Sequence, residues 1–343
     1  KEIINVNNPI NLFKSNDAEM MDLVKNITSG KTPDALILMG VNPVYTAPNG
    51  SSIREALSKV PLTVSTAAYE DETAVACKYV VPNHHALEAW NDFQPKMNEY
   101  AVAQPTIRPL HDTYQAEESL LVWAGLAQRQ GKDSRVYFDF IKDTWKANGF
   151  DTAAYDNFDM FWNKTIHNSS MSMDVNSPSN PEFNNAALAG ISSKLPKGGD
   201  LEVVVYQKAA IGTGEQAGNP WLQEMPDPIS KVTWDNYITM NPIEMEKAGY
   251  NQNIDQEHGC SVASITVGDT TLKLPVYPAP GQALGTVGVD LGYGRGENNE
   301  KIGKAAYHTK EYGGYQMGEN ENRVTIGENA FKFIQTASGT MEY

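Results

Sequence analysis

Hydrophobic positions in the first third of the chain alternate between a helical and an extended period. Apolar residues spaced three and four apart predict a helix capped by Asn16, a second helix opened by Ser52, and a short third one over residues 72–77. Continuous apolar runs predict strands over residues 35–39, 62–65 and 78–81. Such runs are typical of strands buried on both faces, and the β–α–β–α–β order predicts a parallel, Rossmann-like α/β sheet.

The middle of the chain follows a different pattern. Residues 82–112 have no clear period and form a long excursion. Helical spacing resumes at Thr113 and predicts a helix that Gly131 ends, with further helices near residues 134–147 and 155–167. Residues 168–200 are rich in Ser, Asn, Pro and Gly, a composition that indicates a loop or domain linker.

Beyond this linker, short strands predominate. They are predicted over residues 201–206, 262–267, 270–277, 286–291 and 323–326, with one helix at 242–248 that Gly249 ends. Gly268-Asp269 is a two-residue hairpin signal, and the prolines and glycines between residues 275 and 285 suggest the corners of a barrel. We therefore expect an α/β domain with a helical extension over 1–167, a linker over 168–200, and a β-barrel domain over 201–343.

Charge narrows the classes of partner. The 343 residues carry a formal net charge of −15, spread evenly along the chain. Nucleic-acid grooves and polybasic membrane anchors need an excess of cationic side chains, so neither is expected. No apolar run approaches the roughly 18 residues that cross a bilayer, so we expect no membrane span. Because the chain does not begin with Met, we expect a processed protein or a piece of a longer one.

Cysteine usage limits the metal chemistry. Cys77 and Cys260 are the two cysteines of the chain. They cannot supply the four thiolates of the usual iron–sulfur cluster or of a Cys₄ zinc site. One disulfide is arithmetically allowed, but two separate buried thiols are favoured.

Two short motifs resemble ligand sites. Ser29-Gly30-Lys31-Thr32 is similar to the end of a phosphate-binding P-loop, but a helix precedes it and a strand follows it, the reverse of the order that this chemistry needs. His84, His85 and Glu88 could be considered for zinc, yet adjacent histidines cannot both point into one helical site. A structural role in holding a loop is favoured for this histidine group.

Two further motifs also have a simpler interpretation. Glu70-Asp71-Glu72 is expected to complement the dipole at a helix N-terminus rather than to form a catalytic carboxylate pair. The glycine-rich segment 292–296 follows a strand and precedes no helix, so a tight turn is favoured over dinucleotide binding. No G-x-S-x-G nucleophile elbow is present, and the residues alone identify no complete active site.

An ordered series of strings carries a family resemblance. The strings are Gly40–Pro43, Glu70–Ala74, Tyr79–Asp92 and Gln104–Leu110, and they resemble the molybdopterin oxidoreductase superfamily of polysulfide, thiosulfate and nitrate reductases. Three later strings, Gly218–Pro228, Val232–Tyr237 and Gly288–Arg295, look like one branch. That branch is the large iron–sulfur, molybdopterin-like subunit of bacterial alternative complex III, a quinol:cytochrome c oxidoreductase.

The resemblance implies a fold and a site. It implies that the C-terminal domain is a double-psi barrel similar to molybdopterin dinucleotide-binding domains. It also implies that Gly40, Asn42, Glu72, Thr73 and Arg295 line a relic of a dinucleotide pocket. This branch is thought to have lost the pterin, so no cofactor is expected in the chain itself. Iron–sulfur clusters are expected elsewhere in the full-length protein.

Two functions follow from the resemblance. The first is a non-catalytic scaffold within the iron–sulfur subunit of a membrane respiratory complex, bound to its other subunits on the extracytoplasmic (periplasmic) face of the cytoplasmic membrane. The alternative is part of a catalytic molybdenum bis-pterin reductase, which would hold molybdopterin guanine dinucleotide. A free-standing binding module is a weaker third interpretation. On the first hypothesis the chain belongs to an oxidoreductase without being catalytic by itself.

The expected pocket has a defined place. Gly40–Pro43 and Glu70–Thr73 should lie side by side at the carboxyl edge of the parallel sheet, where open α/β sheets bind ligands. A pyrophosphate there would need basic or amide donors. Arg54 is the nearest arginine in sequence, and three consecutive acidic residues should weaken phosphate binding. We therefore expect an empty crevice with no micromolar affinity for guanine nucleotides.

Overall fold

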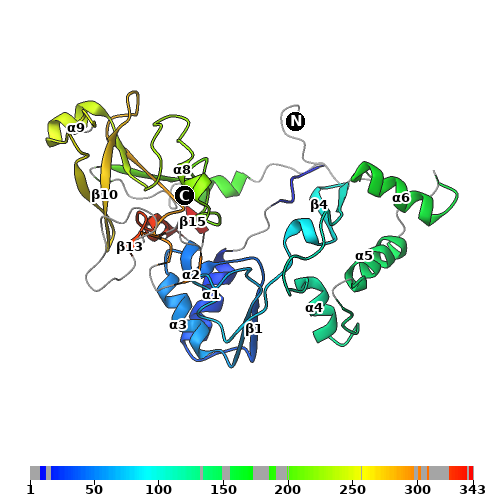
Figure 1. Ribbon diagram of the computed structural model, residues 1–343. Helices are drawn as coiled ribbons and strands as arrows, with labels where there is room; N and C mark the ends of the chain where they lie inside the picture. Colours follow the sequence, from blue (N-terminus) through cyan, green and yellow to red (C-terminus); the bar gives the residue numbers. More distant parts are fainter. Residues whose placement is uncertain are drawn as a thin grey trace. The chain divides into compact units, whose positions relative to one another are not determined.

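The computed structural model groups the chain into two compact units that interleave along the sequence (Figure 1). The described residues are 8–12, 17–131, 134–148, 155–172, 185–190, 199, 201–255, 257–296, 300–302, 307–308, 324–337 and 340–342. Unit 1 comprises residues 1–16, 66–68 and 81–190, and unit 2 comprises residues 17–65, 69–80 and 191–343. The expected domains are consecutive, whereas these units alternate, so the boundaries at 167 and 201 stay a prediction.

Unit 2 contains the predicted parallel sheet. Strands β1 (Ala35–Leu38), β2 (Leu62–Ser65) and β3 (Tyr79–Val80) pair in parallel in that order. Helices α1 (Asp17–Thr28) and α3 (Gly50–Lys59) share a hydrophobic core with Leu36 and Leu38 of β1. Ile37, which points to the other face, is 40% exposed. The expectation that β1 is buried on both faces is therefore wrong, because helices cover one face of this strand within the unit.

Two local predictions in this region are also wrong. Residues 72–77 form turns rather than a helix. The Val75 amide bonds the carbonyl four residues back, but the Ala76 and Cys77 amides bond carbonyls only three back, and β3 begins at Tyr79. The pattern also missed the short helix α2 (Pro43–Thr46), which begins with a proline at its first position. The Asn16 cap lies outside the described residues.

A second, strongly curled sheet of half-barrel form lies in unit 2. Its strands are β7 (Glu202–Tyr206), β8 (Ile238–Met240), β9 (Val262–Val267), β10 (Thr270–Pro278) and β11 (Thr286–Asp290), in the order β7-β11-β8-β10-β9. The β9–β10 hairpin around Gly268-Asp269 is confirmed, and so is α9 (Pro242–Ala248), which Gly249 ends at a φ of +75°. The fold is thus mixed α/β with a half-barrel, and closure into a double-psi barrel stays a prediction.

The half-barrel has its own core. Alternate residues of β10 and β11 point inward, among them Leu274, Val276, Val287 and Val289, and they pack against Met245 and Phe331. Smaller elements complete the unit: α8 (Pro220–Glu224), η5 (Ala330–Phe333), and the strand pairs β12 (Tyr307–His308) with β13 (Val324–Thr325) and β14 (Gln335–Ala337) with β15 (Thr340–Glu342). None of the five half-barrel strands extends the parallel sheet, as predicted.

Unit 1 is built around aromatic side chains. Strands β4 (Asn91–Lys96), β5 (Glu99–Ala103) and β6 (Ser170–Ser172) form an antiparallel sheet, and helices α4 (Ala116–Trp123), α5 (Val136–Ala147) and α6 (Phe158–Asn168) accompany it (Figure 1). Helices α5 and α6 confirm their predictions, whereas α4 ends eight residues before Gly131. The excursion 82–112 contains the β4–β5 hairpin and the 3₁₀ turn η1 (Ala86–Glu88). Of the expected linker, the described residues are 168–172, which include β6, η2 (Asn185–Gly190) and residue 199.

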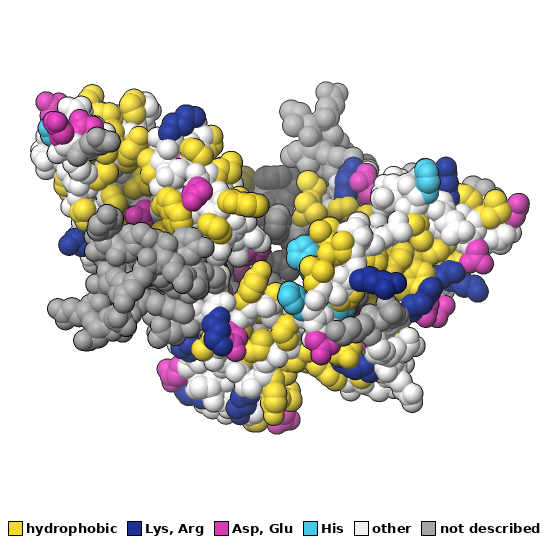
Figure 2. Space-filling model, viewed as in Figure 1, with side chains coloured by type: hydrophobic (Ala, Val, Ile, Leu, Met, Phe, Trp, Pro, Cys, Tyr) yellow, Lys and Arg dark blue, Asp and Glu magenta, His cyan; other side chains and the backbone are white. Residues whose placement is uncertain are grey.

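Two global expectations can be compared with the described residues. Cys77 is half-buried and Cys260 is exposed, and both thiols are free. They are therefore separate, as favoured, but not buried as expected. None of the helices in the described part of the chain has the length and apolarity that a bilayer crossing requires. On the face in Figure 2, charged side chains of both signs are interspersed with hydrophobic ones.

A buried ion pair stands at the end of β11. Lys208 Nζ lies 3.5 Å from Asp290 Oδ2, and both side chains are almost fully buried. The lysine also donates a hydrogen bond to the carbonyl of Asp235, at 3.2 Å. Burial raises the pKa of Asp290 to about 6, and the charge of Lys208 only partly offsets that effect.

This pair predicts a pH-dependent stability. Because the pKa of Asp290 is higher in the folded state than its usual value of 3.8, its contribution is fully present below pH 3.8 and is lost as the pH rises through about 6. We expect the free energy of unfolding to lose roughly 2 kcal/mol from this source between pH 4 and pH 7. Urea denaturation across that range should show a flatter profile for Asp290→Asn and an unchanged one for Asp269→Asn in the exposed hairpin. Parallel profiles for wild type and Asp290→Asn would contradict the assignment.

Candidate functional site

The loops that follow β1 and β2 lie side by side, as predicted. Asn42 Nδ2 donates a hydrogen bond to Glu72 Oε2 at 2.8 Å. Asn42 Oδ1 accepts from Thr73 Oγ1 at 2.6 Å and from the Thr73 amide at 3.1 Å. Thr73 Oγ1 in turn accepts from the amide of Val44 at 3.1 Å. The two strand ends are therefore joined by side chains rather than separated by an open crevice.

A buried ion pair anchors this junction. Arg295 donates from Nε to Glu72 Oε1 at 2.8 Å and from Nη2 to Glu72 Oε2 at 2.7 Å, which is the bidentate geometry of strong charge-assisted pairs. Its Nη1 donates to the carbonyl of Gly214. The guanidinium carbon lies 4.4 Å from the centre of the Tyr45 ring. The Glu72 and Arg295 side chains are only 7% and 6% exposed.

The pairing outweighs the cost of burial for both charges. Burial would raise the pKa of Glu72, but its hydrogen bonds to Arg295, the Arg295 charge and the Asn42 amide together hold that pKa below its usual value. For Arg295 burial acts to lower the pKa, and the contacts with Glu72 raise it instead. Both groups are consequently ionised at neutral pH.

The acidic run around Glu72 is compensated residue by residue. Glu70 Oε2 lies 2.5 Å from Lys301 Nζ, and Asp71 accepts backbone amides in a turn. Burial raises the pKa of Asp71. The expected helix N-terminus is absent from residues 72–77, so the dipole interpretation of this run is wrong.

The counter-charge of Glu72 comes from a distant part of the chain. Arg54, the nearest arginine in sequence, pairs instead with the buried carboxylate of Glu300 at 2.9 Å. Arg295, which lies 223 positions beyond Glu72 in the chain, supplies the counter-charge. Proximity along the chain was therefore a poor guide to electrostatic partners.

Four of the five predicted site residues meet in one cluster. Asn42, Glu72, Thr73 and Arg295 form the hydrogen-bond network described above. Gly40 lies in the same loop as Asn42, with a φ of +61°, and takes no part in the network among the described residues. That these residues line a relic of a dinucleotide pocket stays a prediction.

The glycine-rich turn after β11 positions Arg295. Gly292, Gly294 and Gly296 have φ values of +99°, +71° and +80°, a left-handed conformation that other residues adopt at a cost. A Cβ on Gly294 would lie 2.3 Å from the amide nitrogen of Asn329. These facts agree with the tight-turn interpretation, and they show why the chain can pass so close to the segment before η5.

This turn supplies a stability prediction. Gly294→Ala combines an unfavourable φ with a backbone clash, and we expect it to cost about 2–5 kcal/mol of unfolding free energy. Gly268→Ala is the matched control: its φ is +59°, nothing lies within 4 Å of the added methyl group, and about 1–2 kcal/mol is expected. Equal losses for the two variants in urea denaturation would contradict the close packing at Gly294.

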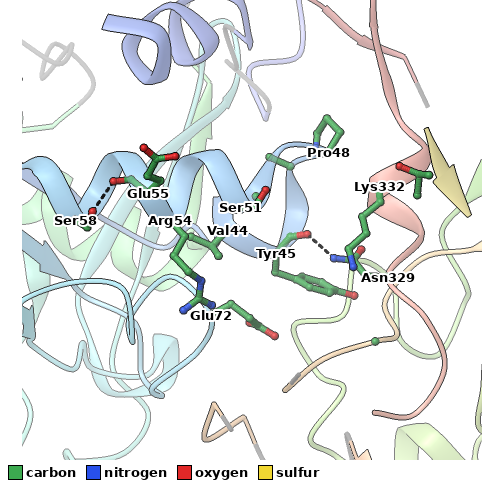
Figure 3. A pocket seen from close by; sticks show the side chains of 14 residues that line it. Val44, Tyr45, Pro48, Ser51, Arg54, Glu55, Ser58, Glu72, Asn329 and Lys332 are labelled. Atoms are coloured by element: carbon green, nitrogen blue, oxygen red, sulfur yellow. Dashed lines mark hydrogen bonds between the residues drawn. The ribbon is translucent and has the colours of Figure 1, made fainter. Parts of the chain in front are cut away.

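A cavity of about 760 Å³ opens beside the cluster (Figure 3). It is lined by residues of α2, α3, the turn between β2 and β3, and the C-terminal segment, among them Tyr45, Ser51, Arg54, Glu72, Asn329 and Lys332. Asn329 Nδ2 donates to the carbonyl of Tyr45 at 3.1 Å, and Tyr45 Oη donates to the carbonyl of Tyr293 at 2.7 Å. Burial raises the pKa of Tyr45, so the phenol stays protonated. Sequence reasoning had named Arg54 and Glu72 but missed Tyr45 and Asn329, because no local motif links positions 45 and 329.

The other two candidate motifs have structural roles. Gly30 ends α1 at a φ of +93°, and the Lys31 amide donates to the Asn26 carbonyl at 2.9 Å, so this segment is a helix cap and not a phosphate loop. His85 and Glu88 form a reciprocal capping box around η1. His84 Nδ1 lies 2.7 Å from Thr113 Oγ1. Among the described residues, no three His, Cys, Asp or Glu side chains gather closely enough to hold a metal ion.

Comparisons with known proteins place this fold. No protein-family model matches the chain. Over 276 residues it is 28% identical to the menaquinone reductase, molybdopterin-binding-like subunit, of Nitratidesulfovibrio vulgaris, which covers 78% of this chain and 37% of that protein. Acetylene hydratase from Pelobacter acetylenicus matches 83% of the chain and 40% of its own, with a TM-score of 0.56 and 14% identity. The chain has a molybdopterin oxidoreductase-like fold.

A third match is shorter. The probable oxidoreductase YyaE of Bacillus subtilis is 27% identical over 119 residues, which cover 34% of this chain and 18% of that protein. The chain thus spans about two-fifths, or less, of the length of these three proteins.

The cluster does not fit the pyrophosphate of a molybdopterin dinucleotide. A pyrophosphate needs hydrogen-bond donors that face it. Here the Nε, Nη1 and Nη2 groups of Arg295 already donate to Glu72 and Gly214, and the Glu72 carboxylate adds a negative charge beside them. The cation at the strand ends is therefore already paired with a carboxylate of the protein.

Separating this pair should be costly. Removing one partner of a buried ion pair leaves an uncompensated charge, so Arg295→Ala is expected to lower the unfolding free energy by about 3–5 kcal/mol. Glu72→Gln should cost less than Arg295→Ala, since glutamine keeps one acceptor for the guanidinium. Because the pKa of Glu72 is lowered, the wild-type contribution should be present above pH 4.5 and fall as the pH drops through the lower folded value.

The exposed Glu55–Lys59 pair on α3 provides the control. Lys59→Ala should cost at most about 0.5 kcal/mol, because solvent screens that pair. Urea denaturation of single and double variants would give the coupling energy between Glu72 and Arg295. A coupling below about 1 kcal/mol would contradict a dominant role for the pair.

Proposed function

We propose that this chain is a non-catalytic, molybdopterin-like scaffold within a subunit of a membrane quinone oxidoreductase. In this proposal, electrons pass through iron–sulfur clusters elsewhere in the full-length protein, and the chain binds neighbouring subunits. The observation that carries the proposal is the Glu72–Arg295 pair, in which the cation at the strand ends is already paired with a carboxylate of the protein. The fold and the match to a menaquinone reductase subunit supply the class of protein.

Finer parts of the proposal depend on the sequence strings. The segments at 218–228, 232–237 and 288–295 favour the alternative complex III branch and, with it, a place on the periplasmic face of the cytoplasmic membrane. We also propose that the half-barrel closes into a double-psi barrel in the complete protein. On this view Gly40, Asn42, Glu72, Thr73 and Arg295 mark a former dinucleotide pocket.

In this proposal the residues of the cluster hold the structure together and take no part in a reaction. Asn42 and Thr73 hold the two strand-end loops together, and Arg295 ties them to the turn that follows β11. Such a junction keeps the parallel sheet and the half-barrel in a fixed arrangement inside unit 2. A scaffold for clusters and partner subunits needs that rigidity.

One observation favours the alternative of a catalytic molybdenum bis-pterin reductase. The cavity of about 760 Å³ has room for a ligand, and Arg54 and Lys332 place cationic groups on its wall. Arg54 is already paired with Glu300, however, and Glu55 and Glu72 add negative charge to the same wall. The balance of charge therefore supports the scaffold.

Metal, pterin and nucleotide measurements test the proposal. The full-length protein, isolated with its iron–sulfur clusters, should contain less than about 0.1 molybdenum or pterin per chain. Titration calorimetry of the chain with GDP should show no binding at micromolar concentration, because the carboxylates repel phosphate and Arg295 is engaged. Stoichiometric molybdenum, or tight GDP binding that Arg54→Ala abolishes, would overturn the scaffold in favour of the reductase.

A further inference from the structure

A surface loop of unit 2 presents large apolar side chains to solvent. We call residues 219–230 the Trp221 loop. Trp221 is 81% exposed, Ile229 is 92% exposed and Met225 is 44% exposed. Leu222, in the same loop, instead packs against the core that contains Ile211 and Tyr293. The loop therefore buries its inner apolar side chain in the core and leaves its outer apolar side chains exposed to solvent.

Hydrogen bonds fix the first half of the loop. Asn219 caps α8 by accepting the Trp221 amide at 3.1 Å. The Gln223 side chain is buried, and its Nε2 donates to the Ala217 carbonyl at 2.9 Å. The backbone carbonyl of Gln223 accepts from the Trp234 amide at 2.9 Å. Met225, which follows α8, donates its amide to the Leu222 carbonyl at 3.3 Å and so ends the helix.

The second half is equally constrained. Asp227 Oδ1 accepts from the amides of Ile229 and Ser230, at 2.9 and 2.8 Å. The Ser230 hydroxyl lies 2.5 Å from Tyr237 Oη, and the Ser230 carbonyl accepts from Tyr277 Oη at 2.9 Å. Exposure of Trp221 and Ile229 is thus imposed by a rigid backbone and is not the result of a loose segment.

Rigid exposed aromatic and aliphatic groups are what protein interfaces use as anchors. Trp is among the residues that contribute most to binding energy, and a pre-ordered loop loses little entropy when it docks. Contiguous exposed apolar surface on a soluble protein also marks an interaction site more often than an accident. The loop therefore has the properties of a binding surface.

Charge around the loop indicates the kind of partner. Glu215 and Glu224 are exposed and carry no ion pair among the described residues. The ammonium of Lys231 is turned back onto the carbonyl of Pro228, at 2.7 Å. Lys231 keeps its positive charge, but with Glu215 and Glu224 the border of the loop has a net negative charge, as does the whole chain at −15. A complementary partner has an apolar cleft edged by Lys or Arg.

We propose that the Trp221 loop docks a neighbouring protein subunit through such a cleft, an inference that rests on the proposed membership of a quinone oxidoreductase complex. An anionic lipid surface fits less well, because it would repel the acidic border. A second copy of the chain fits less well too, since a two-fold interface would bring Glu224 near its own counterpart.

Photo-cross-linking in the native complex tests this surface. A benzophenone amino acid would replace Ile229 in the full-length protein, expressed in its own host, and the complex would be isolated in mild detergent after irradiation. We expect cross-linked peptides from another subunit of the complex. Leu126, which is 74% exposed in unit 1, is the control position, and at least fivefold fewer links to that subunit are expected from it.

Substitution gives the second measurement. Trp221→Ala combined with Ile229→Ser should reduce recovery of the cross-linked subunit with the chain at least fivefold, while the melting temperature of the isolated chain stays within about 3 °C of wild type. Leu126→Ala should leave recovery unchanged. Full recovery with the double variant would overturn the proposal.

The remaining outcomes are distinguishable from one another. Cross-links confined to the same polypeptide would overturn the docking proposal and leave the proposed function intact. The docking proposal would also be overturned if Trp221→Ala abolished co-sedimentation with phosphatidylglycerol vesicles, which would indicate a lipid surface. It would likewise be overturned if Trp221→Ala abolished a dimer seen by analytical ultracentrifugation, which would indicate a second copy. Both results leave the proposed function intact. If the full-length protein is recovered from the membrane fraction without any other subunit, both proposals are overturned.

Discussion

The desolvated ion pair between Glu72 and Arg295 is the constraint around which unit 2 is arranged. Taking two charges out of water costs several kcal/mol for each, and the interior repays that cost only when the geometry is close to ideal. Here two parallel hydrogen bonds, the Asn42 amide and the Gly214 carbonyl complete the coordination of both groups. The Tyr45 ring covers the guanidinium, and the three glycines of the turn after β11 adopt the left-handed conformation that places Arg295 there.

The same pair decides what the strand ends can bind. Molybdopterin oxidoreductase-like folds offer loops at the carboxyl edge of a parallel sheet, and such edges bind ligands when donors face outward. In this chain the donors face inward, to a carboxylate of the protein. The cavity nearby keeps its volume, but its wall carries cations that already have partners or acidic neighbours. The cavity volume alone would allow a ligand to bind, whereas the paired charges on the cavity wall disfavour an anionic ligand and support the scaffold.

Much of the fold was predictable, for reasons that particular residues illustrate. Apolar runs located β1, β2 and β3, and the rule that parallel strand ends share one edge placed Asn42 beside Thr73. The β4–β5 hairpin escaped because Pro95 interrupts the strand and its turn has Asn98 at a φ of +66° with no glycine. Arg295 could not be assigned to Glu72, since no local pattern records a contact across 223 positions. The exposure of Trp221 likewise depends on distant hydrogen bonds.

The length of chain between the two charged partners has a consequence during synthesis. A ribosome adds roughly 5–20 residues per second, so Glu72 emerges about 10–45 s before Arg295 does. For that interval the loops after β1 and β2 lack the cation around which they close, and the Tyr45 hydroxyl lacks the Tyr293 carbonyl, which lies 248 positions away. The loops after the amino-terminal strands therefore stay incompletely folded until the carboxyl-terminal third of the chain has been synthesised. In that interval they expose the groups that a chaperone would bind.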